Sequence, residues 1–376
     1  MTKRSRESED PLFDWLALER IPRVGPLSIA RLIAAFGTPR AAMEADAKEI
    51  QRRSGLNERL ARSVVEFVIP RDEIAREMEL LERLEVTVIT RWDPAYPAHL
   101  KEIYDPPALL FVRGRISEQD SRAVAVVGTR NPSRYGLEMT ERIAKDLACA
   151  GVTLVSGLAR GIDTACHRVA LREGGRTIGV LGCGIDVTYP RENKSLIEEI
   201  VQSGAVITEF RPGVPPLATN FFRRNRIVSG LSRGVVVVEA ADNSGSLITA
   251  NHAVDQNRDV FAVPGNVLNL RSRGPHRLLK QGAALTESAQ DVLEALFSNQ
   301  GQPVQAQLLA PPAPNDALPD TARRVLEAMD PDPVPIDFLC ETLGMEPGRL
   351  SGILLELELG GLIRQHPGKM FSRRQI

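Results

Sequence analysis

Val124-Ala125-Val126-Val127 runs directly into Gly128-Thr129-Arg130, and this passage from an apolar run into a polar turn decides the fold. The same passage recurs at residues 152–163, 178–184 and 234–246. Short apolar runs bounded by turn residues are typical of strands buried on both faces, and helical patterns separate these runs. The alternation predicts an α/β fold with a doubly wound, mostly parallel sheet that is covered by helices on both faces.

The turns after these strands predict a binding site for phosphates. Because the carboxyl ends of parallel strands meet at one edge of a sheet, ligands of such folds bind there. Gly128 lies in the first turn, and Ser156, Gly157 and Gly161 would offer free backbone N–H donors in the second. Arg130 can hold a phosphate with two parallel hydrogen bonds, although a structural contact with a carbonyl or an acid is an equal alternative. Several such turns favour a surface for a string of phosphates.

The turn after the third strand adds a further cation. It reads Tyr189-Pro190-Arg191-Glu192-Asn193-Lys194, and Pro190 can start a helix whose first turn exposes Asn193 and Lys194. A cation at this end opposes the helix dipole, so it needs an anion or solvent beside it. Of these two, binding of an external phosphate explains the position of Lys194 more specifically.

The most polarised segment lies at residues 220–231. There, two aromatic residues precede a cluster of cations and an amide, namely Phe221, Phe222, Arg223, Arg224, Asn225 and Arg226. Cations for the backbone and aromatic faces for the bases are what single-stranded nucleic acid requires. Alternatively, the phenylalanines belong to the core and the arginines form a solvated face. Since a helix turns by about 100° per residue, the arginines cannot all face one ligand.

Motifs of nucleotide-binding enzymes are missing from the chain. Neither the G-x-G-x-x-G dinucleotide fingerprint nor the P-loop motif occurs, and the sequence predicts no metal or other cofactor. Asp163 falls in the first turn of a helix, where capping is the simpler explanation. His167, one turn later, is expected to be packed or on the surface rather than catalytic.

Composition and pattern divide the chain into four parts. Residues 1–115 form a helical domain whose turn at Gly25 resembles a helix-hairpin-helix (or SAM-like) unit, which either grips DNA phosphates or packs. Residues 116–298 form a Rossmann-like domain, and 299–319 a Pro/Ala/Gln-rich linker. Residues 320–376 suit a winged helix. The third helix of this last part sets Arg349 against Glu356 and Glu358, which favours protein contact or packing over DNA reading.

Overall composition excludes little but bounds the class of protein. The 376 residues carry 47 basic and 48 acidic side chains, a net charge of −1, so gross charge argues for no particular partner. There is no apolar run near the roughly 18 residues that span a membrane, and the charged N-terminus lacks the apolar core of a secretion signal. Four cysteines without C-x-x-C spacing suggest reduced thiols and a cytoplasmic location.

Five ordered motifs give the chain a specific resemblance. They are residues 126–130, 156–163, 189–194, 224–231 and 245–250, and the match extends to 263–265 and 282–283. They are spread over about half of the chain, and they resemble the bacterial DNA-processing protein A family (DprA, also called Smf). One departure is Cys166, where alanine is common in the family.

The resemblance implies a cytoplasmic, non-enzymatic protein that binds single-stranded DNA taken up during natural transformation. It also implies a homodimer that protects this DNA and helps the recombinase RecA to load onto it. Family DNA contacts carry over best to Arg130 and to Lys194 beside Asn193. The cluster at 223–226 is expected to belong to the same basic pocket.

Two other interpretations compete with this one. A nucleotide-processing enzyme of the phosphoribohydrolase type has a similar sheet, with a Pro-Gly-Gly-x-Gly-Thr turn followed by a glutamate. Here residues 242–249 have no acid after the turn, and Glu239 is the residue whose replacement would test this interpretation. A purely structural scaffold would not explain why Gly, Ser and Arg gather at the strand ends.

Overall fold

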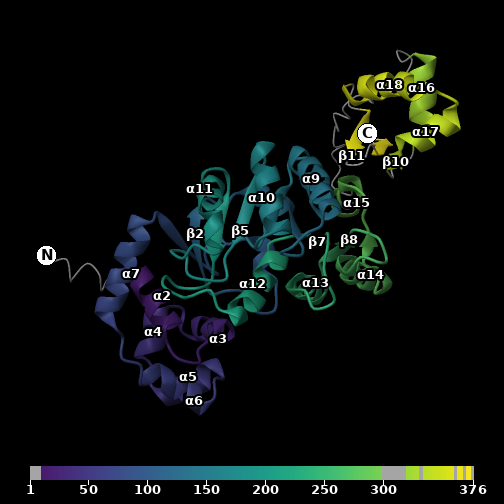
Figure 1. Ribbon diagram of the computed structural model, residues 1–376. Coiled ribbons are helices and arrows are strands. Elements are labelled where there is room, and N and C mark those ends of the chain that lie inside the picture. Colours follow the sequence, from purple (N-terminus) through teal and green to yellow (C-terminus); the bar gives the residue numbers. More distant parts are fainter. Residues whose placement is uncertain (1–9, 299–318, 330–332, 360–361, 367–369, 374–376) are drawn as a thin grey trace. The chain divides into compact units, whose positions relative to one another are not determined.

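The computed structural model describes residues 10–298, 319–329, 333–359, 362–366 and 370–373 (Figure 1). The chain forms two compact units, with bounds at Met1–Gln302 and Pro303–Ile376. All but the last residue of the predicted linker lies outside the described residues.

A nine-stranded sheet forms the centre of the first unit, counted over the described residues. Its strands are β1 (Val86–Thr90), β2 (Leu109–Gly114), β3 (Ala123–Val127), β4 (Thr153–Ser156), β5 (Thr177–Val180), β6 (Ala205–Thr208), β7 (Gly234–Val237), β8 (Asp259–Ala262) and β9 (Ala284–Leu285). Their order is β1-β2-β6-β5-β4-β3-β7-β8-β9. Strands β3 to β9 pair in parallel, whereas β2 runs antiparallel to β6 and to β1. The predicted doubly wound, mostly parallel sheet is confirmed.

Strand β3 shows why these segments form a buried sheet. All its residues are buried, and successive side chains point to opposite faces. Val124 and Val126 belong to the apolar core of one face, whereas Ala125 and Val127 belong to the core of the other. A strand that is buried on both faces needs apolar side chains at every position, so its sequence is an uninterrupted apolar run.

Helices cover both faces of the sheet (Figure 1). One face carries α9 (Arg134–Cys149), α10 (Ile162–Arg172), α11 (Lys194–Ser203) and α15 (Ala289–Phe297). The other carries α8 (Ala98–Lys101), α12 (Ala218–Gly230), α13 (Gly245–Asp255) and α14 (Arg273–Lys280). Three short 3₁₀ helices, η1 (Glu118–Arg122), η2 (Arg191–Asn193) and η3 (Leu270–Ser272), complete the connections.

The N-terminal region is helical and contains two helix–turn–helix pairs. Its helices are α2 (Pro11–Glu19), α3 (Pro26–Phe36), α4 (Pro39–Glu44), α5 (Ala47–Ser54), α6 (Glu58–Val65) and α7 (Arg71–Arg83). Gly25 caps the start of α3, and Gly55 ends α5 in the left-handed region with φ 68°. Helices α2 to α6 share a small apolar core of their own.

The boundary predicted at residue 115 cuts through a continuous sheet. Strand β2 pairs with β6, so that Phe111 lies opposite Thr208, and β1 pairs with β2 along its whole length. Phe13 of α2 and Ile74 of α7 pack into the same core as Phe111. The N-terminal helices are therefore joined to the sheet by hydrogen-bonded strands as well as by packing.

The second unit has the order of elements of a winged helix. It contains α16 (Asp320–Glu327), β10 (Val334–Pro335), α17 (Ile336–Leu343), α18 (Pro347–Leu359), β11 (Ile363–His366) and β12 (Met370–Arg373). The strands pair in the order β10-β12-β11. Leu339, Leu350, Leu354 and Phe371 contribute to its separate core. The predicted winged helix is confirmed.

Candidate nucleic-acid interface

A cleft lies at the carboxyl ends of the parallel strands. It consists of two adjoining hollows, of about 160 and about 670 Å³, and we call it the strand-edge cleft. Both hollows are lined by Arg130, Gly157, Ala159, Tyr189 and Phe221. The turns after β3, β4 and β5 and the first part of α12 thus contribute to one site.

The larger hollow occupies the position where the winding of the sheet reverses. The chain proceeds from β3 through β4 and β5 to β6, and then returns to place β7 on the other side of β3. The turn after β3, residues 128–130, and the segment after β7, with Ala241 and residues 243–246, both line this hollow. Ligands of doubly wound folds bind in the crevice at this reversal.

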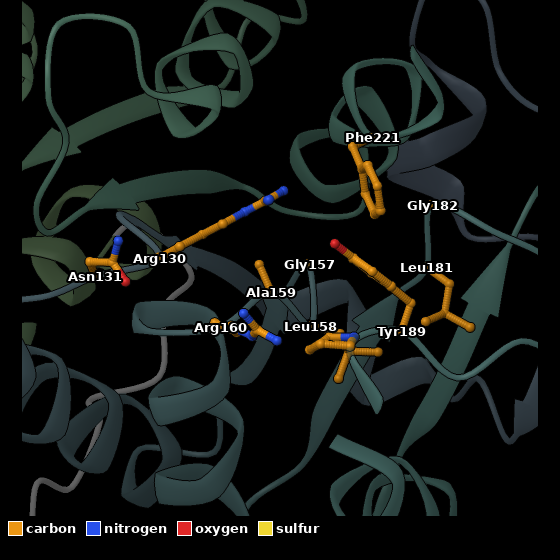
Figure 2. A pocket seen from close by; sticks show the side chains of 11 residues that line it. Arg130, Asn131, Gly157, Leu158, Ala159, Arg160, Leu181, Gly182, Tyr189 and Phe221 are labelled. Atoms are coloured by element: carbon orange, nitrogen blue, oxygen red, sulfur yellow. The ribbon is translucent and has the colours of Figure 1, made fainter. Parts of the chain in front are cut away.

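Two aromatic rings and an arginine meet in the cleft. The ring centroids of Tyr189 and Phe221 are 5.3 Å apart with an angle of 40° between the rings. The guanidinium carbon of Arg130 lies 5.7 Å from the Phe221 centroid, within range of a cation–π contact. Figure 2 shows these three side chains converging from separate segments. Arg130 is exposed, so its charge is available to a ligand.

Glu239 fixes the turn that carries Arg130. It is 1% exposed, and its carboxylate accepts hydrogen bonds from the backbone N–H and the hydroxyl of Ser133. Its carbonyl oxygen accepts the N–H of Thr129 at 2.7 Å. Glu239 therefore holds the two ends of the turn at residues 128–133, and its carboxylate is engaged within the protein.

A side chain of the protein already fills the backbone nest of the second turn. Leu158 has a left-handed backbone with φ 57°, an arrangement that turns neighbouring N–H groups towards one point. The Asp163 oxygen Oδ2 accepts the N–H groups of Gly157 and Ala159 at 3.1 and 3.4 Å. The prediction that Gly157 offers a free N–H donor is wrong, because a carboxylate from the following helix takes it.

Arg224 lies directly beneath this turn. Its buried guanidinium donates to the carbonyl oxygens of Gly157 and Val180. A side chain at Gly157 would begin 2.6 Å from the guanidinium nitrogen Nη2 and would displace the guanidinium. Asn225 accepts from Arg224 at 3.2 Å and donates to the Gly245 carbonyl at 3.1 Å. Both Arg224 and Asn225 line the larger hollow.

Ser156 and Asn193, both predicted as DNA contacts, instead hold strands and turns together. The Ser156 hydroxyl is fully buried and donates to the Val126 carbonyl at 2.7 Å, which joins β4 to β3. The Asn193 amide is buried and donates to the Leu158 carbonyl at 3.0 Å and to the Thr164 hydroxyl at 2.9 Å. The structure corrects both to structural roles, because their polar atoms are used inside the protein.

The arginine cluster divides between the cleft and an internal ion network. Arg226 is 4% exposed and binds Glu209 at 2.8 Å and Asp105 at 2.8 Å. Its predicted place in the DNA-binding pocket is corrected, since it is buried among acids. Arg223 is half exposed and also binds Glu209, at 2.8 Å. Neither arginine is among the residues that line the two hollows.

Lys194 and Gly128 keep positions at the same edge of the sheet. Lys194 is the exposed first residue of α11 and directly follows Asn193, which is tied to the second turn. It does not line either hollow, so its predicted contact would lie at the rim. Gly128 lines the larger hollow. Arg160, which lines the smaller hollow, is paired with Glu192.

The sequence did not predict that Tyr189 and Asp163 line the cleft. Tyr189 is 37% exposed and faces the cleft, and an aromatic side chain in a polar turn after a strand was the available signal. The position of Asp163 could not be inferred, because its contact with residue 157 depends on the left-handed backbone of Leu158.

The remaining titratable groups near the cleft are poorly placed for acid–base chemistry. His167 is fully buried, with Nδ1 2.7 Å from the Thr177 hydroxyl, and burial lowers its pKa to about 3. Cys166 and Cys183 are buried free thiols, and burial raises the pKa of Cys183 to about 11. Over the described ranges, His, Cys, Asp and Glu form no group of three that could hold a metal ion.

Three family matches cover most of the chain. Residues 87–297 match the family described as DNA recombination-mediator protein A. Residues 9–79 match the DprA-like N-terminal HHH domain, and residues 309–369 match the DprA winged helix domain. Protein Smf of Escherichia coli (strain K12) is 41% identical over 323 residues, which are 85% of this chain and 85% of that protein.

Two solved structures are similar to the chain. The X-ray structure of DNA processing protein A from Streptococcus pneumoniae has a TM-score of 0.67 and 37% identity, and it covers 76% of this chain and 97% of its own. DNA processing protein A from Helicobacter pylori, described with its single-stranded DNA binding mode, has a TM-score of 0.51 and 30% identity and covers 57% and 96%. Among the helices of the described residues, none has the length and apolar character needed to cross a membrane.

Proposed function

This chain belongs to the DNA recombination-mediator protein A (DprA/Smf) family, and we propose that its strand-edge cleft binds single-stranded DNA. The observation that carries the proposal is the meeting of Arg130 with the rings of Tyr189 and Phe221. Unpaired bases can stack on such rings while a cation holds the phosphates. A duplex keeps its bases stacked on one another, so the rings favour a single strand. The relative from Helicobacter pylori, described with its single-stranded DNA binding mode, supports the same ligand class.

Replacing Arg130 tests the proposal. A charge-assisted hydrogen bond contributes about 1.5–3 kcal/mol, so we expect Arg130→Ala to weaken oligothymidine binding by roughly 10- to 100-fold. The slope of log affinity against log salt should become shallower by about 0.7 for each phosphate that the variant no longer neutralises. Fluorescence anisotropy over a series of salt concentrations measures both quantities.

Arg172→Ala is the matched control for this experiment. Arg172 is an exposed arginine at the end of α10, where it is paired with Glu141 and Glu173. It lines neither hollow. It should leave affinity and salt slope unchanged. Equal decreases in the two variants, or none in Arg130→Ala, would remove the cleft as the binding site.

Lys194 is proposed as a second phosphate contact at the rim. Its exposure and its place at the start of α11, beside the anchored Asn193, support this role. We expect Lys194 to contribute less to DNA affinity than Arg130, because Lys194 lies outside the hollows. The Lys194→Ala variant should lower affinity together with the salt slope.

We also propose that the cleft binds without breaking bonds. The carboxylates that an enzyme would need are already engaged, Glu239 with Ser133 and Asp163 with backbone N–H groups. The buried His167 is neutral near pH 7. Release of base from a nucleoside monophosphate by the purified protein, abolished in Glu239→Gln, would contradict this proposal.

A homodimer is the proposed assembly. Supporting it, Val267, Leu268 and Leu270 are 77%, 87% and 60% exposed within four residues of one another, and clustered apolar exposure marks interaction surfaces. We expect Leu268→Glu to convert dimers to monomers in sedimentation experiments. Val68→Glu, at an equally exposed position in the N-terminal region, should leave the dimer intact. A monomeric parent protein would contradict the proposal.

RecA loading during natural transformation in the cytoplasm is proposed from family membership. The described residues carry no motif that identifies a recombinase contact, and the proposal depends on the relatives named above. A direct measurement is the rate at which RecA forms filaments on oligothymidine covered by a single-strand binding protein. This protein should raise that rate, and Arg130→Ala should reduce the effect in proportion to its weaker DNA binding.

A further inference from the structure

The strand-edge cleft contains a seat for an anion that the protein itself fills. Backbone N–H groups of Gly157 and Ala159 point at one oxygen of Asp163, at 3.1 and 3.4 Å. The backbone of Gly128, from the first turn, also favours the charged form of this carboxylate and acts to lower its pKa. The carboxylate therefore sits where two strand-end turns direct their donors.

The surroundings of this seat suit an anion of any origin. It lies at the first turn of α10, whose dipole favours negative charge. The buried guanidinium of Arg224 lies beside the same turn and supplies positive charge. In other proteins with doubly wound sheets, this combination of amide nest and helix start holds a phosphate.

Asp163 also faces the ligand space. It is 6% exposed and lines the larger hollow together with Arg130, Phe221 and Arg224. A side chain that served only to start α10 could cap it from the outer surface. Here the carboxylate lies between the cleft and the nest, so whatever enters the cleft meets a side chain that already occupies the N–H donors.

We propose that Asp163 is a specificity-determining residue, which excludes free phosphate and phosphate monoesters from the amide nest and thereby reserves the cleft for internal nucleotides of a strand. The inference deepens the proposed function, on which its second half rests. A phosphate monoester presents three oxygens and up to two negative charges, which suit a nest of N–H donors. A phosphodiester has ester groups on both sides and one charge, so it is held better at the exposed Arg130 while its bases lie on the rings.

Emptying the seat tests the inference. Asp163→Ala removes the carboxylate and leaves the amide donors and Arg224 in place, so the variant should gain a phosphate site. We expect it to bind inorganic phosphate and thymidine 5′-monophosphate at least about tenfold more tightly than the parent, since charged hydrogen bonds are regained. Isothermal titration measures the affinities. Thermal melting in phosphate, compared with chloride at equal ionic strength, should show stabilisation of the variant alone.

Asp291→Ala is the matched control. Asp291 also lies in the first turn of a helix and accepts two backbone N–H groups, those of Glu287 and Ser288, both at 2.9 Å. It lines neither hollow. This variant should lose stability without any response to phosphate. Asp163→Ser, which retains a capping hydroxyl and still empties most of the seat, serves if the alanine variant does not fold.

The outcomes separate this inference from the proposed function. A folded Asp163 variant with no gain in phosphate affinity over Asp291→Ala would overturn the inference. So would a parent protein that binds phosphate as tightly as the variant. Oligothymidine binding by the parent, and its decrease in Arg130→Ala, is measured separately, and failure there would overturn DNA binding while leaving the phosphate result interpretable.

Discussion

Arg224 is a cation kept in the protein interior by hydrogen bonds to Asn225 and to two backbone carbonyl groups. Burial lowers its pKa to about 10, against the opposing effect of Asp163, so it is charged at neutral pH. Burial raises the pKa of Asp163, while Arg224 and the backbone N–H groups act in the opposite direction. The charge of each group thus offsets part of the effect of burial on the pKa of the other. Arg224 therefore supports the floor of the cleft and is not free to follow a ligand.

His167 makes stability depend on pH. Its pKa of about 3 in the folded state lies below the ordinary 6.5, so below pH 6.5 the unfolded chain takes up a proton that the folded chain does not. Stability is fully present above pH 6.5 and is lost as the pH falls towards 3. Between pH 7 and pH 5 the loss from this residue is about 2 kcal/mol. His167→Gln should reduce the fall in urea-unfolding free energy over this interval by that amount, and an unchanged fall would contradict the assignment.

Helix α12 (Ala218–Gly230) serves two purposes because of its pitch. Phe221 and Asn225, four residues apart, lie on one side and line the cleft. Arg226, about 100° further round from Asn225, meets Glu209 and Asp105. The sequence of this helix therefore contains both a binding face and an internal anchor, which are distinguished by helical position and not by residue type.

Replacing the two arginines that share Glu209 should separate these purposes. Arg226→Ala leaves the Glu209 carboxylate, which is 3% exposed, without its buried partner, so we expect a loss of about 3–5 kcal/mol in unfolding free energy. Arg223 is half exposed, and Arg223→Ala should cost less than about 1 kcal/mol. Denaturant titrations of the two variants measure the difference. Equal losses would show that burial does not govern the pair.

The sequence allowed the sheet and its binding edge to be predicted, but only part of the side-chain roles. The apolar run at 124–127 is buried on both faces, and such a run has few alternatives to a parallel strand. The exposure of Arg130 was predictable because its own turn contains no acid that can neutralise it. Ser156, Asn193 and Arg226 looked like ligand contacts because their residue types are polar. Their partners, Val126, Leu158 and Glu209, lie far along the chain and became apparent only in the fold.

At the scale of the whole chain, the two compact units have separate cores. All residues that line the strand-edge cleft belong to the first unit. The third helix of the winged helix, α18, combines Arg349 with Glu356 and Glu358, which gives it little net positive charge for a phosphate backbone. We therefore expect DNA affinity to reside in the first unit.

A chain that ends at residue 302 tests this expectation. It retains the sheet, its helices and the cleft, so it should fold and bind oligothymidine within about twofold of the full chain, as expected for independent parts. Fluorescence anisotropy measures the affinity, and circular dichroism monitors folding. A folded truncated chain whose affinity falls about tenfold would assign a DNA contact to the winged helix.

The pairing of β1 and β2 with the rest of the sheet has a mechanical consequence. Both strands are the chain's own route out of the N-terminal helices, and β2 is bonded to β6 along four residue pairs. A force on α2 or α7 is thus transmitted through backbone hydrogen bonds to β6. This strand lies beside β5, and the end of β5 opens onto the cleft. A partner that bound the N-terminal helices could therefore act on the cleft for which we propose DNA binding.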